Sequence, residues 1–149
     1  GLEVAGPVLV KPQGFLDLFQ QLGKRWTAKN LSTFVTSGVH AGEAPENTAM
    51  PYAVLAPISE IPAEETTDNI YYRISFEIAL YVTTFEEAST LLPLVVNAFK
   101  YAPLNLSSGA LLTLYERSQR YTFMRQQQYW KATQDMVAMT VRETNFSPV

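Results

Sequence analysis

The side chains that could do chemistry in this chain are few and scattered. There is one histidine, His40, and no cysteine, so thiolate metal sites and cysteine nucleophiles are excluded. His40 stands in a turn-rich segment, and no serine or aspartate lies near it at the spacing of a catalytic triad. A zinc site there would need three carboxylates as its other ligands, which is atypical for zinc. We therefore expect a surface histidine, no catalytic residue, no metal site and no cofactor.

Charged side chains are segregated along the sequence. Residues 43–68 contain six acids and no base, and residues 117–131 contain four bases and no acid. The acids fit no calcium-loop pattern, so solvated loop charge is the simplest interpretation. Two oppositely charged surfaces on one subunit also suit head-to-tail contacts between copies, which close into rings when the rotation permits. The candidate subunit-contact or lumen residues are Glu43, Glu46, Glu60, Glu64, Glu65, Asp68, Arg117, Arg120, Arg125 and Lys131.

Aromatic residues are interleaved with the bases between residues 115 and 131. Such a mixture could stack on a single-stranded nucleic acid and neutralise its phosphates. The formal net charge of -3 and the pI of about 5.1 oppose broad phosphate affinity. A sheet with one aromatic face and one charged face is therefore the favoured interpretation. Nucleotide binding has no support either, because no glycine-rich phosphate-binding string is present.

Length and composition favour one globular domain over residues 1–149. The chain is 47% hydrophobic and 17% charged, as an ordinary globular protein is. A chain of this size can bury roughly two thirds of the surface that its unfolded form exposes, enough for a single core. No apolar stretch approaches the ~20 residues of a membrane-spanning helix, so we expect no membrane partner. Residues 1–11 are expected to form an extended or flexible N-terminal segment.

Periodicity predicts the first elements. Residues 12–26 place apolar side chains at helical spacing, whereas residues 36–51 collect Gly, Pro, Asn and Glu without periodicity and are typical of a loop. A short strand is predicted over residues 51–58, followed by an acidic connection over residues 59–69. Residues 72–82 alternate apolar and polar side chains, which indicates a strand with one core face and one wet face.

The second half of the chain predicts one helix and more strands. Thr84 and Glu87 have the spacing of a capping box, so a helix is expected to begin there. Strands are predicted over residues 111–117, 120–125 and 129–143. The expected fold class is α+β, a mainly antiparallel β-sheet of about four to five strands with two α-helices packed on one face.

Four segments, taken in order, resemble a known family. They are residues 39–55 (VHAGEAPENTAMPYAVL), 72–82 (YRISFEIALYV), 85–104 (FEEASTLLPLVVNAFKYAPL) and 128–143 (QYWKATQDMVAMTVRE). Together they resemble the phage tail terminator or tail completion proteins, a family of small head-tail joining proteins that includes those similar to minor tail protein U. The shared order is an early helix, a loop that ends in a Pro-Tyr strand start, a long strand, a helix and a closing strand.

The resemblance implies a non-enzymatic structural protein of a phage or prophage, found in the virion or in the bacterial cytoplasm before assembly. Such proteins form a homo-oligomeric ring, commonly a hexamer, that ends the tail tube and joins it to the head. The implied partners are further copies of the chain, tail tube proteins and head-completion proteins. DNA would pass through the lumen without sequence-specific binding, and residues 39–50 and 59–69 become candidate contact or lumen regions.

Two other hypotheses remain open at this point. One is a small dimeric α+β binding module that holds an apolar ligand on its sheet or between helix and sheet. The other is an enzyme that uses His40 with an acidic partner, which the sequence favours least.

Overall fold

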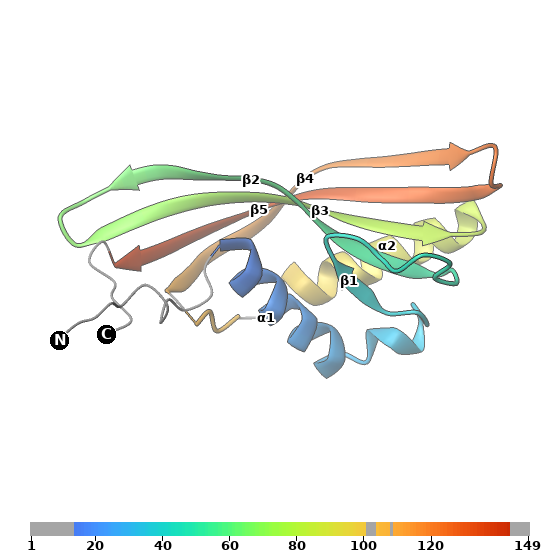
Figure 1. Cartoon of the computed structure of the whole chain (residues 1–149), viewed down its shortest axis with the longest axis horizontal. Coiled ribbons are helices and arrows are strands. Elements are labelled where there is room, and N and C mark those ends of the chain that lie inside the picture. Colours follow the sequence, from blue (N-terminus) through green and yellow to red (C-terminus); the bar gives the residue numbers. More distant parts are fainter. Residues whose placement is uncertain (1–13, 101–103, 108, 144–149) are drawn as a thin grey trace.

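The structure, a computed structural model, describes residues 14–100, 104–107 and 109–143. The segment predicted over residues 1–11 lies outside them. Figure 1 shows long strands that span the molecule, with the helices on one side. In chain order the elements are α1 (Gly14–Ala28), the 3-10 helix η3 (Leu31–Thr33), β1 (Val39–Ala41), β2 (Tyr52–Glu65), β3 (Asn69–Val82), α2 (Phe85–Lys100), β4 (Ala110–Met124) and β5 (Tyr129–Glu143).

The strands of the described chain form one sheet in the order β1-β2-β3-β5-β4. All neighbours are antiparallel except β1 and β2, which run parallel. The β2–β3 hairpin closes where Glu65 pairs with Ile70, and the β4–β5 hairpin closes where Met124 pairs with Tyr129. These two turns lie at opposite ends of the sheet (Figure 1). The predicted α+β fold with a mainly antiparallel sheet is confirmed.

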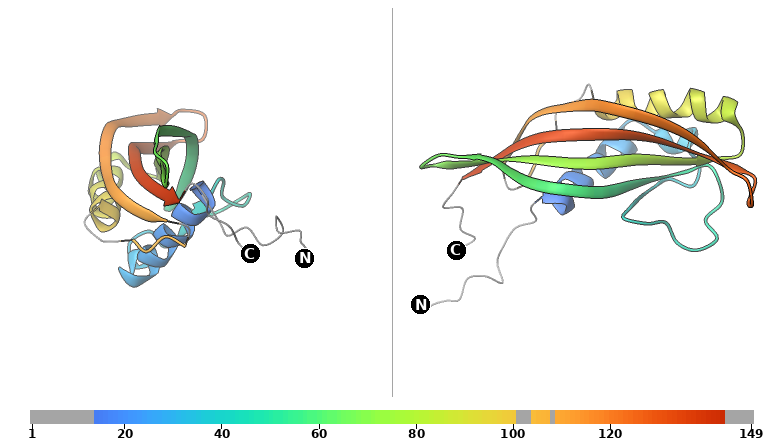
Figure 2. Two further views of the ribbon diagram at one scale, coloured as in Figure 1. Left: turned by 90° about the vertical axis from the view of Figure 1, so that its left-hand side faces the viewer. Right: turned by 90° about the horizontal axis from the view of Figure 1, so that it is seen from above.

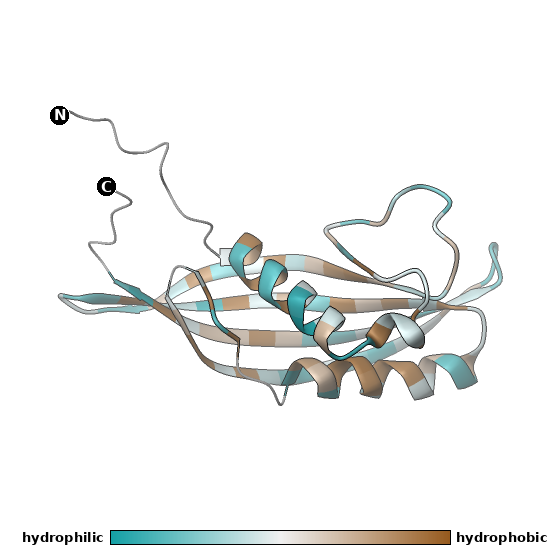
Figure 3. Cartoon of the chain, turned by 90° about the horizontal axis from the view of Figure 1, so that it is seen from below, coloured by the Kyte–Doolittle hydropathy of each residue, from teal (hydrophilic) through white to brown (hydrophobic). Residues whose placement is uncertain are grey.

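Both helices pack on one face of the sheet, as predicted (Figure 3). Their helical spacing of apolar residues buries one stripe of each helix: α2 packs mainly against β3 and β5, and α1 packs against α2, β1 and β2. The rings of Phe19 and Phe76 meet edge to face, with centroids 5.6 Å apart. Burying one large apolar side chain contributes roughly 1.5–3 kcal/mol, so this face supplies most of the hydrophobic stabilisation. Fully buried members of the core include Leu18, Leu22, Phe76, Ile78, Leu92 and Phe99.

The start of α2 follows the predicted capping sequence with one change. The Glu87 backbone N–H donates to Thr84 Oγ1 at 3.1 Å. The Glu87 carboxylate accepts a hydrogen bond from the backbone N–H of Thr83, at 3.2 Å, one residue earlier than the capping box predicts. The first bond satisfies an N–H group that the first turn of a helix leaves without an intrahelical partner, and the second ties the residue before the cap to the same turn.

A buried carboxylate ties α1 to the connection between α2 and β4. Asp17 is 1% exposed, and its two carboxylate oxygens accept the Ser107 backbone N–H at 2.9 and 3.0 Å. A carboxylate that is removed from water needs such donors to offset its lost hydration. This contact fixes the position of α1 against a segment 90 residues further along the chain.

Two predicted strand boundaries are wrong, for local reasons. The acidic connection predicted over residues 59–69 is largely strand, because β2 continues to Glu65. The strands predicted over residues 111–117 and 120–125 are a single strand, β4, whose register shifts between Glu116 and Gln119. A β-bulge of this kind interrupts the side-chain alternation without ending the strand.

The loop predicted over residues 36–51 contains a short strand. β1 pairs in parallel with the start of β2, and Gly38 (φ 78°) and Gly42 (φ 85°) flank it. Positive φ angles are readily accessible to glycine, so the chain can turn sharply before and after three paired residues. The chain from residue 42 onward then loops out beside the sheet before β2 begins (Figure 2).

Candidate interaction surface on the concave sheet face

The sheet face away from the helices is concave. β2 and β4 are not hydrogen-bonded neighbours, yet side chains from both line one concavity of about 410 Å³. The curl of the sheet that brings them together is visible down the long axis (Figure 2). Ala79 and Val137 point to this face by strand alternation, and both are buried because the sheet curls around them. We call this cavity the concave pocket, and the residues that matter most below are Ile58, Ile61, Arg73, Arg117, Ser118 and Asp135.

Two bulges supply side chains to the concave pocket. The register of β2 shifts around Ile58, and the register of β4 shifts around Arg117 and Ser118. All three residues line the pocket. A bulge adds a residue that is not paired in the ladder and re-aims its side chain. The pocket is therefore built where the strands are irregular.

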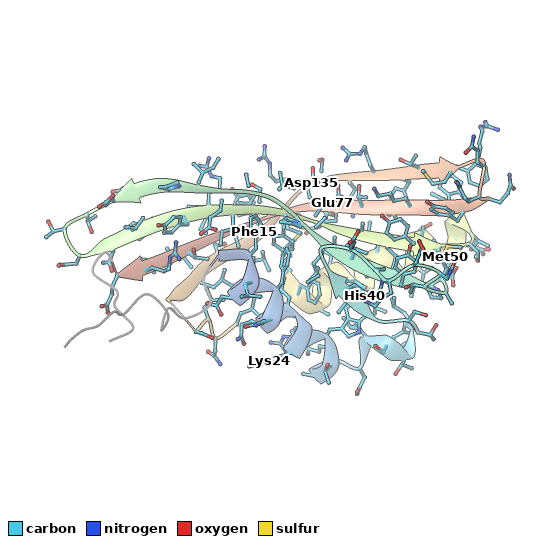
Figure 4. All side chains as sticks on the ribbon, viewed as in Figure 1. Phe15, Lys24, His40, Met50, Glu77 and Asp135 are labelled. Atoms are coloured by element: carbon cyan, nitrogen blue, oxygen red, sulfur yellow. The ribbon has the colours of Figure 1, made fainter. Side chains whose placement is uncertain are left out.

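The concave pocket holds two arginines, and neither has an ionic partner in the part of the chain that the structure describes. Neither Arg73 nor Arg117 forms a side-chain hydrogen bond or ion pair with the described residues, and both are exposed. The one carboxylate of the pocket, Asp135, accepts a hydrogen bond from Ser118 Oγ at 2.9 Å. Asp135 lies opposite Glu77 on the neighbouring strand, on the side of the sheet away from α1 (Figure 4). The pocket therefore has a net positive charge and two guanidinium groups that can bind an anion.

Apolar side chains stand beside these arginines. Ile58 is 56% exposed and Ile61 is 48% exposed, and both line the pocket. Single exposed apolar residues are common, but two beside a charged cavity combine features of a protein contact site. Such a surface can bury apolar area and form ion pairs in one contact.

The β2–β3 hairpin carries acids at its far end. Glu64, Glu65 and Asp68 are exposed, and no ion pair engages them within the described residues. The turn is fixed locally, because the Thr66 N–H donates to the Asn69 carbonyl at 2.8 Å and the Asn69 N–H donates to Thr66 Oγ1 at 3.0 Å. Figure 3 shows that the hairpin projects beyond both helices. We call Glu64, Glu65 and Asp68 the acidic tip.

Tyrosines pack together at the other end of the concave face. The rings of Tyr52 and Tyr81 stack with centroids 4.7 Å apart, and Tyr129 lies 6.0 Å from Tyr81. The Lys131 ammonium is 5.7 Å from the centre of the Tyr81 ring. Burial raises the pKa of Tyr52 and of Tyr81, and the neighbouring phenols, with Glu77 in the case of Tyr81, add to that rise. This end is a packed aromatic cluster.

The predicted acids fall into separate groups. Three of them form the acidic tip. Glu60 is engaged within the chain, because its carboxylate lies 3.3 Å from Arg142 Nη2. Glu43 and Glu46 lie in the loop after β1, and Glu43 lines a concavity of about 310 Å³ with Tyr129 at the opposite end of the sheet from the tip.

The predicted bases are also divided. Arg117 lines the concave pocket, and Arg125 stands in the turn between β4 and β5. Arg120 lies 3.5 Å from the Glu77 carboxylate on the concave face, so it is already paired. Sequence reasoning did not select Arg73, the second arginine of the pocket. In the sequence, Arg73 is marked only as a residue on the polar face of an alternating strand. Arg73 and Arg117 line the same pocket because the sheet curls, which the sequence pattern does not reveal.

His40 has the surroundings of a structural residue. Its Nε2 lies 3.0 Å from the Ser37 carbonyl oxygen, to which it can donate, and its ring stands 6.2 Å from the ring of Tyr52. Among residues 14–100, 104–107 and 109–143, no three His, Asp or Glu side chains gather as a metal site requires. Neither α-helix in the described part of the chain is long and apolar enough to cross a membrane.

A further concavity, of about 440 Å³, lies between η3 and α2 on the helical side. Phe34 and Leu91 contribute apolar surface to it, but Glu86 and Glu87 also line it. Two carboxylates disfavour an apolar ligand there, because burying a charge without a partner is costly. The cavity therefore lends no support to the binding-module hypothesis.

The fold is shared with a virion protein. One chain of a solved structure described as "Virion of native gene transfer agent (GTA) particle" matches with a TM-score of 0.69 and 21% sequence identity, covering 83% of this chain and 92% of that chain. At this identity the likeness shows a common fold. No curated protein matches the chain.

A family match identifies the class of the chain as a phage structural protein. The matching family is described as Tail completion protein gp17, and the match covers residues 23–140. The chain belongs to this family. The resemblance inferred from the sequence is thereby confirmed, and the family is one of structural proteins.

Proposed function

We propose that this protein forms a ring of identical copies that ends the tail tube and joins it to the head. The family match over residues 23–140 carries this proposal, because the family is described by the completion of a tail. The separation of the acidic tip from the concave pocket supports a head-to-tail contact between copies. Contacts between two different surfaces of one subunit close into a ring when the rotation permits. A hexamer is the expected size, by resemblance to the family.

In this role the ring contacts tail tube proteins on one side and head-completion proteins on the other. DNA crosses its lumen without sequence-specific binding. The formal net charge of -3 supports such passage, because an acidic protein surface does not retain phosphates by counterion release.

The test is a phage or prophage from which the corresponding gene has been removed. We expect filled heads without tails and separate tails of irregular length, as seen by electron microscopy. Adding the purified protein to that extract should restore joined particles with tails of uniform length. An unrelated acidic protein of similar size is the control and should restore nothing. Joined particles of normal tail length in the absence of the protein would contradict the proposal.

A further inference from the structure

We propose that the acidic tip of one copy docks into the concave pocket of the next copy in the ring. The proposal rests on the ring proposed above and adds which surfaces meet. The tip offers Glu64, Glu65 and Asp68, and the pocket offers Arg73 and Arg117.

The two surfaces are complementary in charge. The tip has three carboxylates within five residues, and no base lies between residues 43 and 68. The two arginines of the pocket have no ionic partner within the described residues. Arginine binds carboxylates through paired N–H groups, which fixes orientation as well as energy. The carboxylates of the tip can therefore pair with the guanidinium groups of the pocket.

One chain cannot satisfy this contact by itself. Ile61 at the pocket and Glu65 at the tip belong to the same strand, which is paired with β3 along this stretch. Strand residues advance about 3.3 Å each, so the tip is held more than about 10 Å beyond the pocket. The tip projects past the helices into open space (Figure 3). A second copy must provide the partner, and the contact joins two different surfaces.

The apolar surface of the pocket favours a protein over a phosphate as the occupant. Ile58 and Ile61 are half exposed beside the arginines, and a hairpin tip that enters would cover them. The hydrogen bonds between Thr66 and Asn69 hold the turn in shape before binding. Because the turn is already ordered, less conformational entropy is lost when the tip docks.

Two charge-reversed variants test the contact. The tip variant is Glu64→Lys with Glu65→Lys, and the pocket variant is Arg73→Glu with Arg117→Glu. Association is measured by native mass spectrometry over a concentration series, or by co-sedimentation with purified tail tubes if copies assemble only there. Each variant alone should associate about tenfold more weakly or worse, because each then opposes like charges across the contact. Wild-type association should weaken as salt rises, since surface pairs are screened within about 8 Å at physiological ionic strength.

A mixture of the two variants gives the sharpest result. The lysines of the tip variant fit the glutamates of the pocket variant, and the native tip of the pocket variant fits the native arginines of the tip variant. An equimolar mixture should therefore assemble where neither variant does alone. Its rings should contain only even numbers of copies, in alternating order, which the measured masses reveal.

Matched variants control for the change in net charge. Glu86→Lys with Gln20→Lys and Thr90→Lys changes the net charge by as much as the tip variant does, but at exposed positions on the helices. Lys24→Glu with Lys29→Glu matches the pocket variant on the exposed helical side. Both controls should associate as the wild type does. Circular dichroism and thermal unfolding should show all four variants folded, because every substituted side chain is at the surface.

The outcomes separate this proposal from the proposed function. If the wild type completes tails and both reversed variants assemble normally, the tip–pocket contact is wrong and the ring function stands. If the wild type fails to complete tails but the mixture rescues association, the contact stands and the function is wrong. Binding of DNA that is lost in the pocket variant, with normal association of the tip variant, would assign the arginines to nucleic acid and overturn the proposal.

Discussion

The side chains on the two faces of β3 differ in whether they are covered by other parts of the same chain. Phe76 and Ile78 lie fully buried under the helices, whereas Ser75 and Glu77, their neighbours on the same strand, face the concave side. The covered face is complete within one chain, because its side chains already have apolar neighbours from α1 and α2. The concave face keeps two arginines that have no ionic partner among the described residues, and two half-exposed isoleucines. One face of the sheet therefore holds the fold together, and the other remains available to a neighbour.

This division has an energetic consequence. Exposed ion pairs contribute about 0–1 kcal/mol each, whereas large buried apolar side chains contribute roughly 1.5–3 kcal/mol each. Substitutions on the covered face should therefore act on the free energy of unfolding. Substitutions on the concave face should act on association and leave unfolding nearly unchanged.

Removing a ring from the covered face should have the largest effect. Phe76→Ala deletes a fully buried side chain that packs against Phe19, and it should lower the free energy of unfolding by about 3–5 kcal/mol. Ile61→Ala on the concave face should lower it by less than about 1 kcal/mol, because Ile61 is already half exposed. Urea unfolding followed by circular dichroism measures both. Equal losses for the two variants would show that the concave face contributes to folding as much as the covered face does.

Elements with a regular pattern could be predicted from the sequence. The helical spacing in α1, the capping residues of α2 and the alternation in β3 each depend on nearby residues, so the pattern reveals the element. The second half of β2 has no strand pattern, because residues 61–65 are exposed and two of them are acids. A strand arm that pairs on one side only and is open to water needs no apolar alternation. β1 was missed because three residues between two glycines show no period.

The candidate site could be predicted only in part. The acids of residues 64–68 and Arg117 were selected because charge is visible in the sequence. The pocket itself depends on two bulges and on the curl of the sheet, which bring β2 near β4 although they are not paired. Neither feature has a periodic signal. The pairing of Glu60 with Arg142 likewise joins residues 82 positions apart, which local pattern cannot show.

Two carboxylates, one on each side of the sheet, should differ in the same direction by a smaller amount. Asp17→Asn weakens a buried acceptor of the Ser107 N–H, and it should lower the free energy of unfolding by about 1–3 kcal/mol. Asp135→Asn on the concave face should change it by less than about 0.5 kcal/mol, because the weaker bond from Ser118 is offset by relief of repulsion with Glu77. Thermal unfolding at neutral pH distinguishes them. A larger cost at Asp135 would show that the concave face also contributes to folding.

The smallest effect concerns the tyrosine cluster, the part of the concave face that is packed within one chain. The pKa of Tyr52 and that of Tyr81 are raised from 10.0, mainly by burial, so the folded protein holds these protons more tightly than the unfolded chain. Their contribution to stability is fully present below pH 10, and it is lost as pH rises through the folded pKa values. Replacing both by Phe should remove this part of the alkaline loss while changing stability at neutral pH only slightly. Urea unfolding at several pH values on both sides of 10, for the wild type and the double variant, measures it. Equal alkaline losses in the two proteins would mean that the cluster is as open to water as the rest of its face, and the concave side would then have no self-sufficient region.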